Sequence, residues 1–221
     1  MSTIVFDPYK KVPIGTFLPK IVYALSTPDG GADTDALNSY VVDTIIDFAN
    51  RTRILRREVR IKLQPCVDTY RVDPQDCVEI VALLRVCYPG HSVAITPREP
   101  CGRGCGVSCG PTTVSLDDDG VLHVYPPPAD MGTDDYMELV LAVAPKRDAC
   151  EVDAVVYDKY APVIVSGTLA ELYKNGQAPW FNLTLAQMRE AEYNRKLSAV
   201  GVDRILGLAT GPFRLRGVRI L

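Results

Sequence analysis

The chain has 221 residues, of which 47% are hydrophobic and 23% charged, and its formal net charge at pH 7 is −3. This composition is typical of a soluble globular protein and excludes collagen-like and intrinsically disordered chains. No apolar run approaches the roughly 20 residues that cross a bilayer, so we expect no membrane span. The first residues lack the basic and apolar segments of a secretory signal, so we do not expect secretion. The slightly acidic charge also argues against a surface devoted to nucleic-acid binding.

Seven cysteines, an odd number without a secretory signal, favour reduced thiols in a cytosolic setting. Three of them have strand-like neighbours, and we expect Cys66, Cys77 and Cys87 to be small buried hydrophobic residues.

A second group of cysteines lies in a glycine-rich segment. Cys101, Cys105 and Cys109 are spaced four residues apart, and the glycines between them favour neither helix nor strand. A zinc site usually has two cysteine pairs or a cysteine and a histidine pair. The other candidate ligands are isolated in the sequence: His91, His123 and Cys150. The incomplete ligand set favours a flexible hairpin tip. The alternative is a small metal-binding protein. The sequence does not decide whether these cysteines form disulfides.

The N-terminal part of the chain is predicted to be an extended lead-in over residues 1–32, because it carries four prolines and ends in Pro-Asp-Gly-Gly. A helix follows, and Asp33 or Thr34 can cap it. The run of cations from Arg51 to Arg57 suits the negative end of that helix. The helical spacing is carried by Leu37, Val41, Val42, Ile45, Ile46, Phe48 and Ala49.

The period then changes to that of strands. Alternating or continuous apolar runs, with Asp119-Gly120 as a hairpin turn, predict an antiparallel β domain over residues 58–150. The strands are expected at 58–63, 69–72, 77–87, 112–116, 121–125 and 137–145.

Helical spacing resumes after the strands. We expect one helix to begin between residues 155 and 158, and its small residues Ser166, Gly167 and Ala170 would allow another helix to approach it closely. A second helix begins near residues 182–184, where Thr184 and Gln187 match a capping box. Between them, Trp180 is expected to pin the corner through its buried area.

Together these elements predict an α+β fold. About three main helices, in residues 33–57 and 155–205, form a bundle because none can bury its apolar stripe alone. The β domain is inserted between the first and second of these helices. Extended arms occupy the two ends of the chain, residues 1–32 and 206–221.

The C-terminal arm combines basic and apolar residues and has no acidic residue after Asp203. Such a segment can add to the edge of a partner's sheet or lie in a groove. A frayed terminus is the alternative, but disordered tails seldom carry so many apolar residues. The residues expected to contact a partner are Phe213, Arg214, Leu215, Arg216, Val218 and Arg219.

Motifs of known enzymes are missing from the sequence. There is no Gly-x-Ser-x-Gly, Walker A or His-Glu-x-x-His pattern. The segment Asp117–Gly120 resembles a calcium loop in composition but lacks the downstream glutamate. The two histidines have no partners in the sequence, so we expect no catalytic, cofactor or metal site. Four acidic residues of the first helix could face a DNA channel or form a solvated face, and the solvated face is the simpler interpretation: Asp33, Asp35, Asp43 and Asp47.

Several short motifs together resemble the head-to-tail adaptor proteins of tailed bacteriophages. The order and spacing of these motifs, over residues 17–205, make the resemblance specific. The chain departs from the family by having Ala49-Asn50 where a cysteine is common. The matching segments are Phe17–Val22, Asp35–Thr52, Val121–Pro128, Ile164–Leu172, Pro179-Trp180 and Ala186.

This resemblance implies a structural virion protein rather than an enzyme. Members form a ring, commonly of twelve subunits, between head and tail, and a C-terminal arm docks on the portal protein. The implied partners are the portal ring, further copies of the chain, and a tail tube, nozzle or next neck ring. Genomic DNA would pass through the lumen without sequence-specific binding, in a virion neck assembled in the host cytoplasm. A tail-completion or tail-terminator ring protein is the alternative within the virion.

Overall fold

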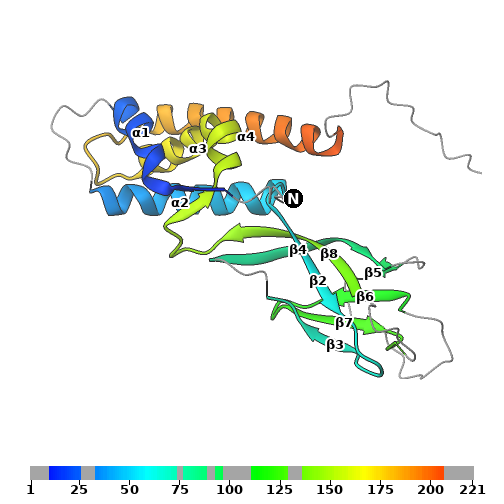
Figure 1. The fold of residues 1–221 in the computed structure, drawn as a ribbon. Helices are drawn as coiled ribbons and strands as arrows, with labels where there is room; N and C mark the ends of the chain where they lie inside the picture. The colour runs from blue at the N-terminus through cyan, green and yellow to red at the C-terminus, as the bar shows by residue number, and fades with distance from the viewer. Residues whose placement is uncertain are drawn as a thin grey trace, which may run out of the picture.

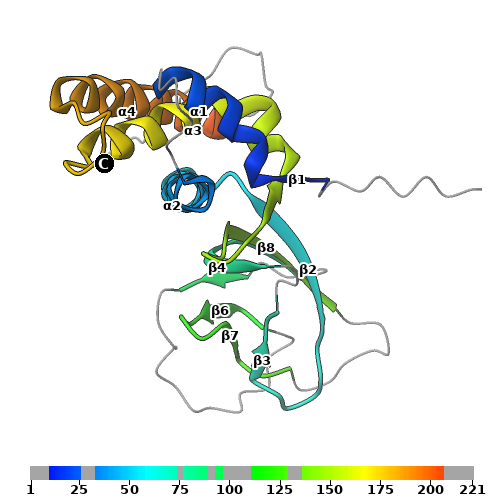
Figure 2. The ribbon, with the colours of Figure 1, turned by 90° about the vertical axis from the view of Figure 1, so that its left-hand side faces the viewer.

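The computed structural model describes residues 10–25, 33–73, 77–88, 93–96, 111–128 and 136–206, with side chains described as far as Gly201. The fold is α+β. Figure 1 shows the helices gathered in one part of the molecule and most strands in the other, with one long helix lying between. Figure 2 shows the same order of layers from the side.

Four α-helices are preceded by a short 3-10 helix, η1. They are α1 (Leu18–Leu25), α2 (Thr34–Thr52), α3 (Ala154–Lys174) and α4 (Leu183–Leu206), and η1 covers Ile14–Phe17. The predicted cap of α2 is confirmed, because the Asp33 carboxylate accepts a hydrogen bond from the Asp35 N–H at 3.1 Å. The helix ends at Thr52 and is capped by Arg53, whose φ of 50° lies in the left-handed region.

The cap of α4 differs from the predicted capping box. The Asn182 side chain accepts a hydrogen bond from the Leu185 N–H at 3.0 Å, and its carbonyl accepts from the Ala186 N–H at 2.9 Å. Thr184 therefore lies inside the helix rather than at its cap. The physical reason is that Asn is at least as good a cap as Thr, and it stands two residues earlier, where the corner ends.

The strands form two larger sheets and a separate pair. One sheet has the order β2-β8-β4 and is antiparallel, and the second has the order β3-β7-β6-β5, in which only β5 and β6 run parallel. The bounds are β1 (Lys11–Pro13), β2 (Arg56–Lys62), β3 (Thr69–Arg71), β4 (Val78–Cys87), β5 (Ala94–Ile95), β6 (Thr113–Leu116), β7 (Val121–Tyr125), β8 (Tyr136–Pro145) and β9 (Glu151–Asp153). All six predicted strands are confirmed.

Strand β8 is the centre of the packing. It pairs with β2 and β4, and it packs against α2. Nearly all its residues are buried, so it has the continuous apolar sequence of a strand covered on both faces rather than an alternating one. Large fully buried side chains from α2 and the strands make up this core: Ile45, Phe48, Leu122, Met137, Leu139 and Leu141.

The N-terminal segment corrects the extended lead-in expected for residues 1–32. Residues 11–25 form β1, η1 and α1, and Phe17 and Ile21 are fully buried. The Phe17 ring meets the edge of the Tyr157 ring on α3, with 5.2 Å between centroids. The prolines do not prevent this packing, because Pro13 ends β1 and Pro19 lies in the first turn of α1, where a missing N–H costs little.

A second correction concerns the cations after α2. The helix ends at Thr52, and both Arg56 and Arg57 belong to β2 rather than to the helix end.

The predicted close approach of helices at Gly167 is confirmed. A Cβ atom at this position of α3 would lie 2.7 Å from the Thr44 methyl on α2 and 2.9 Å from the Tyr193 ring on α4. The Thr168 hydroxyl donates to the Thr44 hydroxyl at 3.2 Å beside this point. The three longest helices therefore meet where only glycine fits.

We predict that Gly167→Ala lowers the free energy of unfolding by about 1–3 kcal/mol, because both neighbours are packed and must shift. Urea titration followed by circular dichroism measures this change. Gly201→Ala on α4 is the matched control, because a Cβ there meets nothing within 4 Å. Its expected effect is a gain of up to about 1 kcal/mol from helix propensity. Equal effects of the two substitutions would contradict the packing argument.

Candidate interaction surfaces

One buried ion pair joins the strands to the helices. The Arg57 guanidinium, on β2, donates to both carboxylate oxygens of Asp153 at 2.9 and 2.7 Å. The two side chains are only 5% and 11% exposed. Because the pair is bidentate and shielded from water, its geometry fixes how the two elements lie relative to each other.

Asp153 lies where three segments meet. It is the last residue of β9 and directly precedes α3, and it stands opposite Lys11 in the β1–β9 pair. The Ala154 N–H donates to the Lys10 carbonyl at 2.7 Å, and the Ile14 N–H donates to the Cys150 carbonyl at 3.0 Å. The N-terminal strand is thus part of the same junction.

The sequence contains a signal for this pair, although the cations at 51–57 were expected to serve the end of the preceding helix. Arg57 alternates in phase with Val59 and Ile61, whereas the residues between them are exposed. A cation on the apolar face of a strand predicts a buried carboxylate partner, because an unpaired buried charge is too costly.

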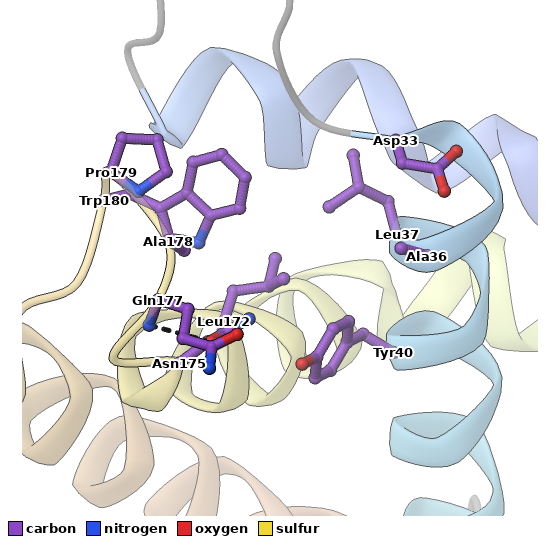
Figure 3. A pocket seen from close by; sticks show the side chains of 10 residues that line it. All are labelled: Asp33, Ala36, Leu37, Tyr40, Leu172, Asn175, Gln177, Ala178, Pro179 and Trp180. Carbon is purple, nitrogen blue, oxygen red and sulfur yellow. Dashed lines mark hydrogen bonds between the residues drawn. The ribbon is translucent and has the colours of Figure 1, made fainter.

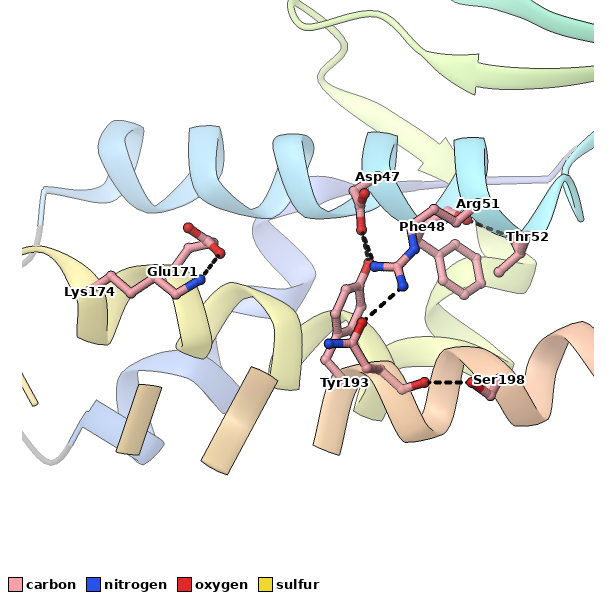
Figure 4. A network of polar contacts seen from close by, with 9 residues as sticks. Asp47, Phe48, Arg51, Thr52, Glu171, Lys174, Tyr193 and Ser198 are labelled. Atoms are coloured by element: carbon pink, nitrogen blue, oxygen red, sulfur yellow. Dashed lines mark hydrogen bonds and ion pairs between the residues drawn. The ribbon is translucent and has the colours of Figure 1, made fainter. Parts of the chain in front are cut away.

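A polar network connects α2 and α4 on the helical side. The Tyr193 hydroxyl donates to the Asp47 carboxylate at 2.7 Å, and Arg51 donates to Asp47 at 3.4 Å and to Asn194 at 2.9 Å. Figure 4 shows Asp47, Arg51 and Tyr193 converging between the two helices. Burial, followed by the nearby Asp47 carboxylate, raises the pKa of Tyr193 far above its ordinary value, so the phenol stays protonated.

A cleft of about 400 Å³ opens beside this network, between α2, α3 and α4. At its border, Lys174 bonds Glu171 at 2.9 Å and Glu190 at 3.2 Å, and these hydrogen bonds raise the pKa of the Lys174 ammonium. The charged groups are thus paired with one another. This arrangement is typical of a helix–helix contact.

The acidic face of α2 is only partly free. Asp43 forms an exposed ion pair with Arg147 at 3.7 Å, and Asp47 belongs to the network described above. Asp33 and Asp35 lie in and beside the first turn, where the helix dipole favours acids. All four carboxylates are exposed, as expected for a solvated helix face.

Trp180 lines a small apolar cleft at the corner between α3 and α4. The cleft has a volume of about 200 Å³, and Figure 3 shows the indole, Leu37 and Tyr40 around it. The Trp180 Nε1 atom is buried and has no hydrogen-bond partner among the described residues. The side chain packs against the core, as expected of a corner residue.

Large apolar side chains are exposed at the start of α4. Leu183 is 56% exposed and Met188 is 63% exposed, with Phe181 and Leu185 beside them in the sequence. On α1, Tyr23 is 88% exposed. Clusters of this kind are typical of surfaces that contact another protein. Helical spacing does not reveal this surface, because it shows which residues share a face of a helix and not which face a neighbour covers.

Of the two histidines, His91 lies outside the described residues and only His123 can be placed. His123 lies on β7, as expected, and its Nε2 atom is 3.3 Å from the Asp117 carboxylate. That carboxylate accepts a hydrogen bond from the Val121 N–H at 2.7 Å, which lowers the pKa of Asp117. Asp117 thus lies in the β6–β7 turn and His123 beside it on β7.

The cysteine expectation is wrong for Cys66, Cys77 and Cys87, which are all exposed. Cys66 lies in a turn with a φ of 58°, and the other two lie at the ends of the edge strand β4. The cluster Cys101, Cys105 and Cys109 lies outside the described residues, as do the arm residues 213–219.

Within the described part, no group of three or more His, Cys, Asp or Glu residues could hold a metal ion. None of the helices in that part is long and apolar enough to cross a membrane.

Comparison with known proteins identifies the chain. The family model described as SU10 adaptor protein matches residues 20–216. The chain belongs to the SU10 adaptor protein family. This membership confirms the resemblance to phage head-to-tail adaptors and indicates a structural rather than catalytic role. It also agrees with surfaces whose charged groups pair with each other and whose exposed features are apolar.

Other comparisons add less. A chain from the solved structure titled "Neck of empty GTA particle computed with C6 symmetry" is 18% identical, with 81% of this chain and 94% of that chain covered, at a TM-score of 0.24. Comparison with the curated proteins gives no match.

We predict that Arg57→Met or Asp153→Leu alone lowers the free energy of unfolding by about 3–5 kcal/mol, because each leaves a buried charged partner unpaired. The double change Arg57→Met with Asp153→Leu recovers most of that loss. The control is Arg60→Met on the same strand, whose ion pair with Glu138 is exposed, with an expected loss of about 1 kcal/mol or less. Chemical denaturation measures all four variants. Additive losses in the double variant would contradict the ion-pair argument.

Proposed function

We propose that this chain forms the head-to-tail adaptor ring of a tailed phage, which docks on the portal, joins the capsid to the tail and continues the DNA channel. The observation that carries the proposal is the family match over residues 20–216. The ring has twelve subunits, the number common in the family that the motifs resemble. It lies in the virion neck and assembles in the host cytoplasm.

The architecture supports this role. α3 packs against α2 and α4, and the strands from β2 to β8 lie between α2 and α3 in the chain. We treat residues 33–57 and 155–205 as one helical bundle and 58–150 as an inserted β domain, which is the arrangement that the resemblance implies. The buried Arg57–Asp153 pair then makes the two parts behave as a single rigid subunit.

Ring formation needs a side face that neighbouring copies can bury. A stable contact requires about 1,200 Å² in total, with apolar anchors near its centre. The start of α4 supplies such anchors in Leu183 and Met188, both more than half exposed. We assign this region to the contact between subunits.

Docking on the portal is assigned to the C-terminal arm of residues 206–221. The arm loses conformational entropy on binding. Backbone pairing and apolar contacts with the portal offset this cost. Arg214, Arg216 and Arg219 supply cations for portal carboxylates or carbonyls, and Phe213, Leu215 and Val218 supply the apolar contacts. The opposite side of the ring meets a tail tube, a nozzle or the next neck ring. DNA passes through the lumen without sequence-specific binding.

Co-sedimentation with the cognate portal ring tests the proposal. We expect the full chain to bind at ring stoichiometry and a chain lacking residues 210–221 to lose binding by tenfold or more. The triple change of Arg214, Arg216 and Arg219 to Lys is the matched control, because it keeps the charge and the length of the arm, and we expect it to retain most of the binding. Full binding by the truncated chain would remove the arm from the mechanism. No binding by the intact chain would favour a tail-completion or tail-terminator protein.

A further inference from the structure

Strand β4 has an open edge. In the described part of the chain it pairs with β8 on one side only, and its ten residues are mostly apolar. The unpaired backbone groups of an edge strand can accept another strand. Register shifts between Ile80 and Ala82 and between Leu83 and Arg85 interrupt the regular ladder, so the edge suits a short segment rather than a long one.

A groove of about 510 Å³ runs along this edge. Four consecutive residues of β4, from Ile80 to Leu83, line it. The register shift between Ile80 and Ala82 breaks the regular alternation of faces here, so four consecutive residues of β4 reach the groove together. The other wall comes from β5, β6 and the turn after β6: Ile95, Thr96, Leu116, Asp117 and Asp118.

The groove is apolar with an acidic end. Among the residues that the structure describes, Asp118 has no hydrogen-bond or ion-pair partner, and the groove lining contains no Lys, Arg or His. Asp117 stays ionised, because the Val121 N–H and His123 lower its pKa. A complementary segment is therefore extended, apolar on one side and basic.

The C-terminal arm has this chemistry. Phe213 and Leu215 alternate with Arg214 and Arg216, so an extended backbone places the apolar and basic side chains on opposite sides. The other long edge of the same sheet does not match. The exposed residues of β2 include three cations and a single acid, Glu58, and they would repel the arm.

The reach of the arm favours a second copy. Only six residues, 207–212, separate the end of α4 from Phe213, and they span about 20 Å when fully extended. α2 lies between α4 and the sheets, and the groove lies beyond it, beside the second sheet (Figure 2). One helix layer and one sheet layer are each about 10 Å thick. The arm of the same chain would have to pass both and then enter the groove.

We propose that residues 211–221 of one copy add to the β4 edge of a second copy, with Phe213 and Leu215 in the groove and the arginines against Asp117 and Asp118. The neighbouring groove and the portal then compete for the same arm. The groove holds the arm while no portal is present. This inference does not require portal docking, since both partners are copies of this chain.

A mixing experiment with full-length variants tests the proposal. The first variant, Ile95→Arg with Asp118→Arg, has an arm but a blocked groove, and both changed residues are exposed. The second, with Arg214, Arg216 and Arg219 changed to Glu, has a groove but an arm of the wrong charge. We expect the affinity of each variant for itself to fall at least tenfold below that of the natural chain. An equimolar mixture should form a one-to-one complex in native mass spectrometry.

The control is Ser39→Arg with Asp158→Arg, which makes the same change in net charge on exposed helix positions. It should self-associate like the natural chain. Self-association unchanged in both test variants would overturn the proposal and leave ring formation through the helices intact. A mixture that forms no complex would also overturn it.

Hydrogen exchange at residues 80–84 identifies the other possible occupants. If the natural chain is a monomer and residues 80–84 are protected in it but not in the arm variant, the arm lies in the groove of its own chain. Protection that the arm variant keeps would mean that another segment, such as residues 97–110, covers the edge. Either result contradicts the exchange of arms between copies. Co-sedimentation with the portal remains a separate measurement, so the failure of one proposal does not affect the other.

Discussion

The fold depends on the buried pair of Arg57 and Asp153, because these residues stand at the two places where the chain crosses between helices and strands. The chain leaves the helices after Thr52 and returns to them at Ala154. Without a fixed link at the crossings, the two parts could swing relative to each other. A bidentate contact resists such motion better than apolar packing, because two parallel hydrogen bonds fix both distance and orientation. Apolar residues of the same size would provide similar stability, but they would not fix the orientation. For a protein with a structural role, this fixed orientation is the larger gain.

The helical side follows a different principle. At Gly167 the absence of a side chain lets α2 and α4 approach α3 together, and the Tyr193 hydroxyl reaches Asp47 across the remaining gap. Backbone proximity and one partly buried hydrogen bond thus determine the spacing of the helices. The exposed apolar residues at the start of α4 lie at the opposite end of that helix from its C-terminal arm. The contact between subunits and the portal contact that we propose would therefore involve separate ends of one helix.

Much of this fold could be predicted from the sequence, because most of its information is local. Strand alternation, the Asp33 cap and the small residue at 167 are all patterns within one element. The N-terminal segment was harder, because β1 is three residues long and exists only through pairing with β9, about 140 positions away. The Arg57 partner is similarly distant. The exposed apolar residues of α4 were also beyond prediction, since helical spacing shows which residues share a face and not which face a neighbour covers.

The pairing of β1 with β9 has a consequence for how the protein is made. Lys11 leaves the ribosome long before Asp153 does, and at roughly 5–20 residues per second the wait is about 7–28 s. During that time β1 has no partner strand, and Phe17 has no Tyr157 to pack against. β8, the most apolar strand, also emerges before α3. The junction therefore closes only after synthesis passes Asp153, when about 70% of the 221 residues have been made.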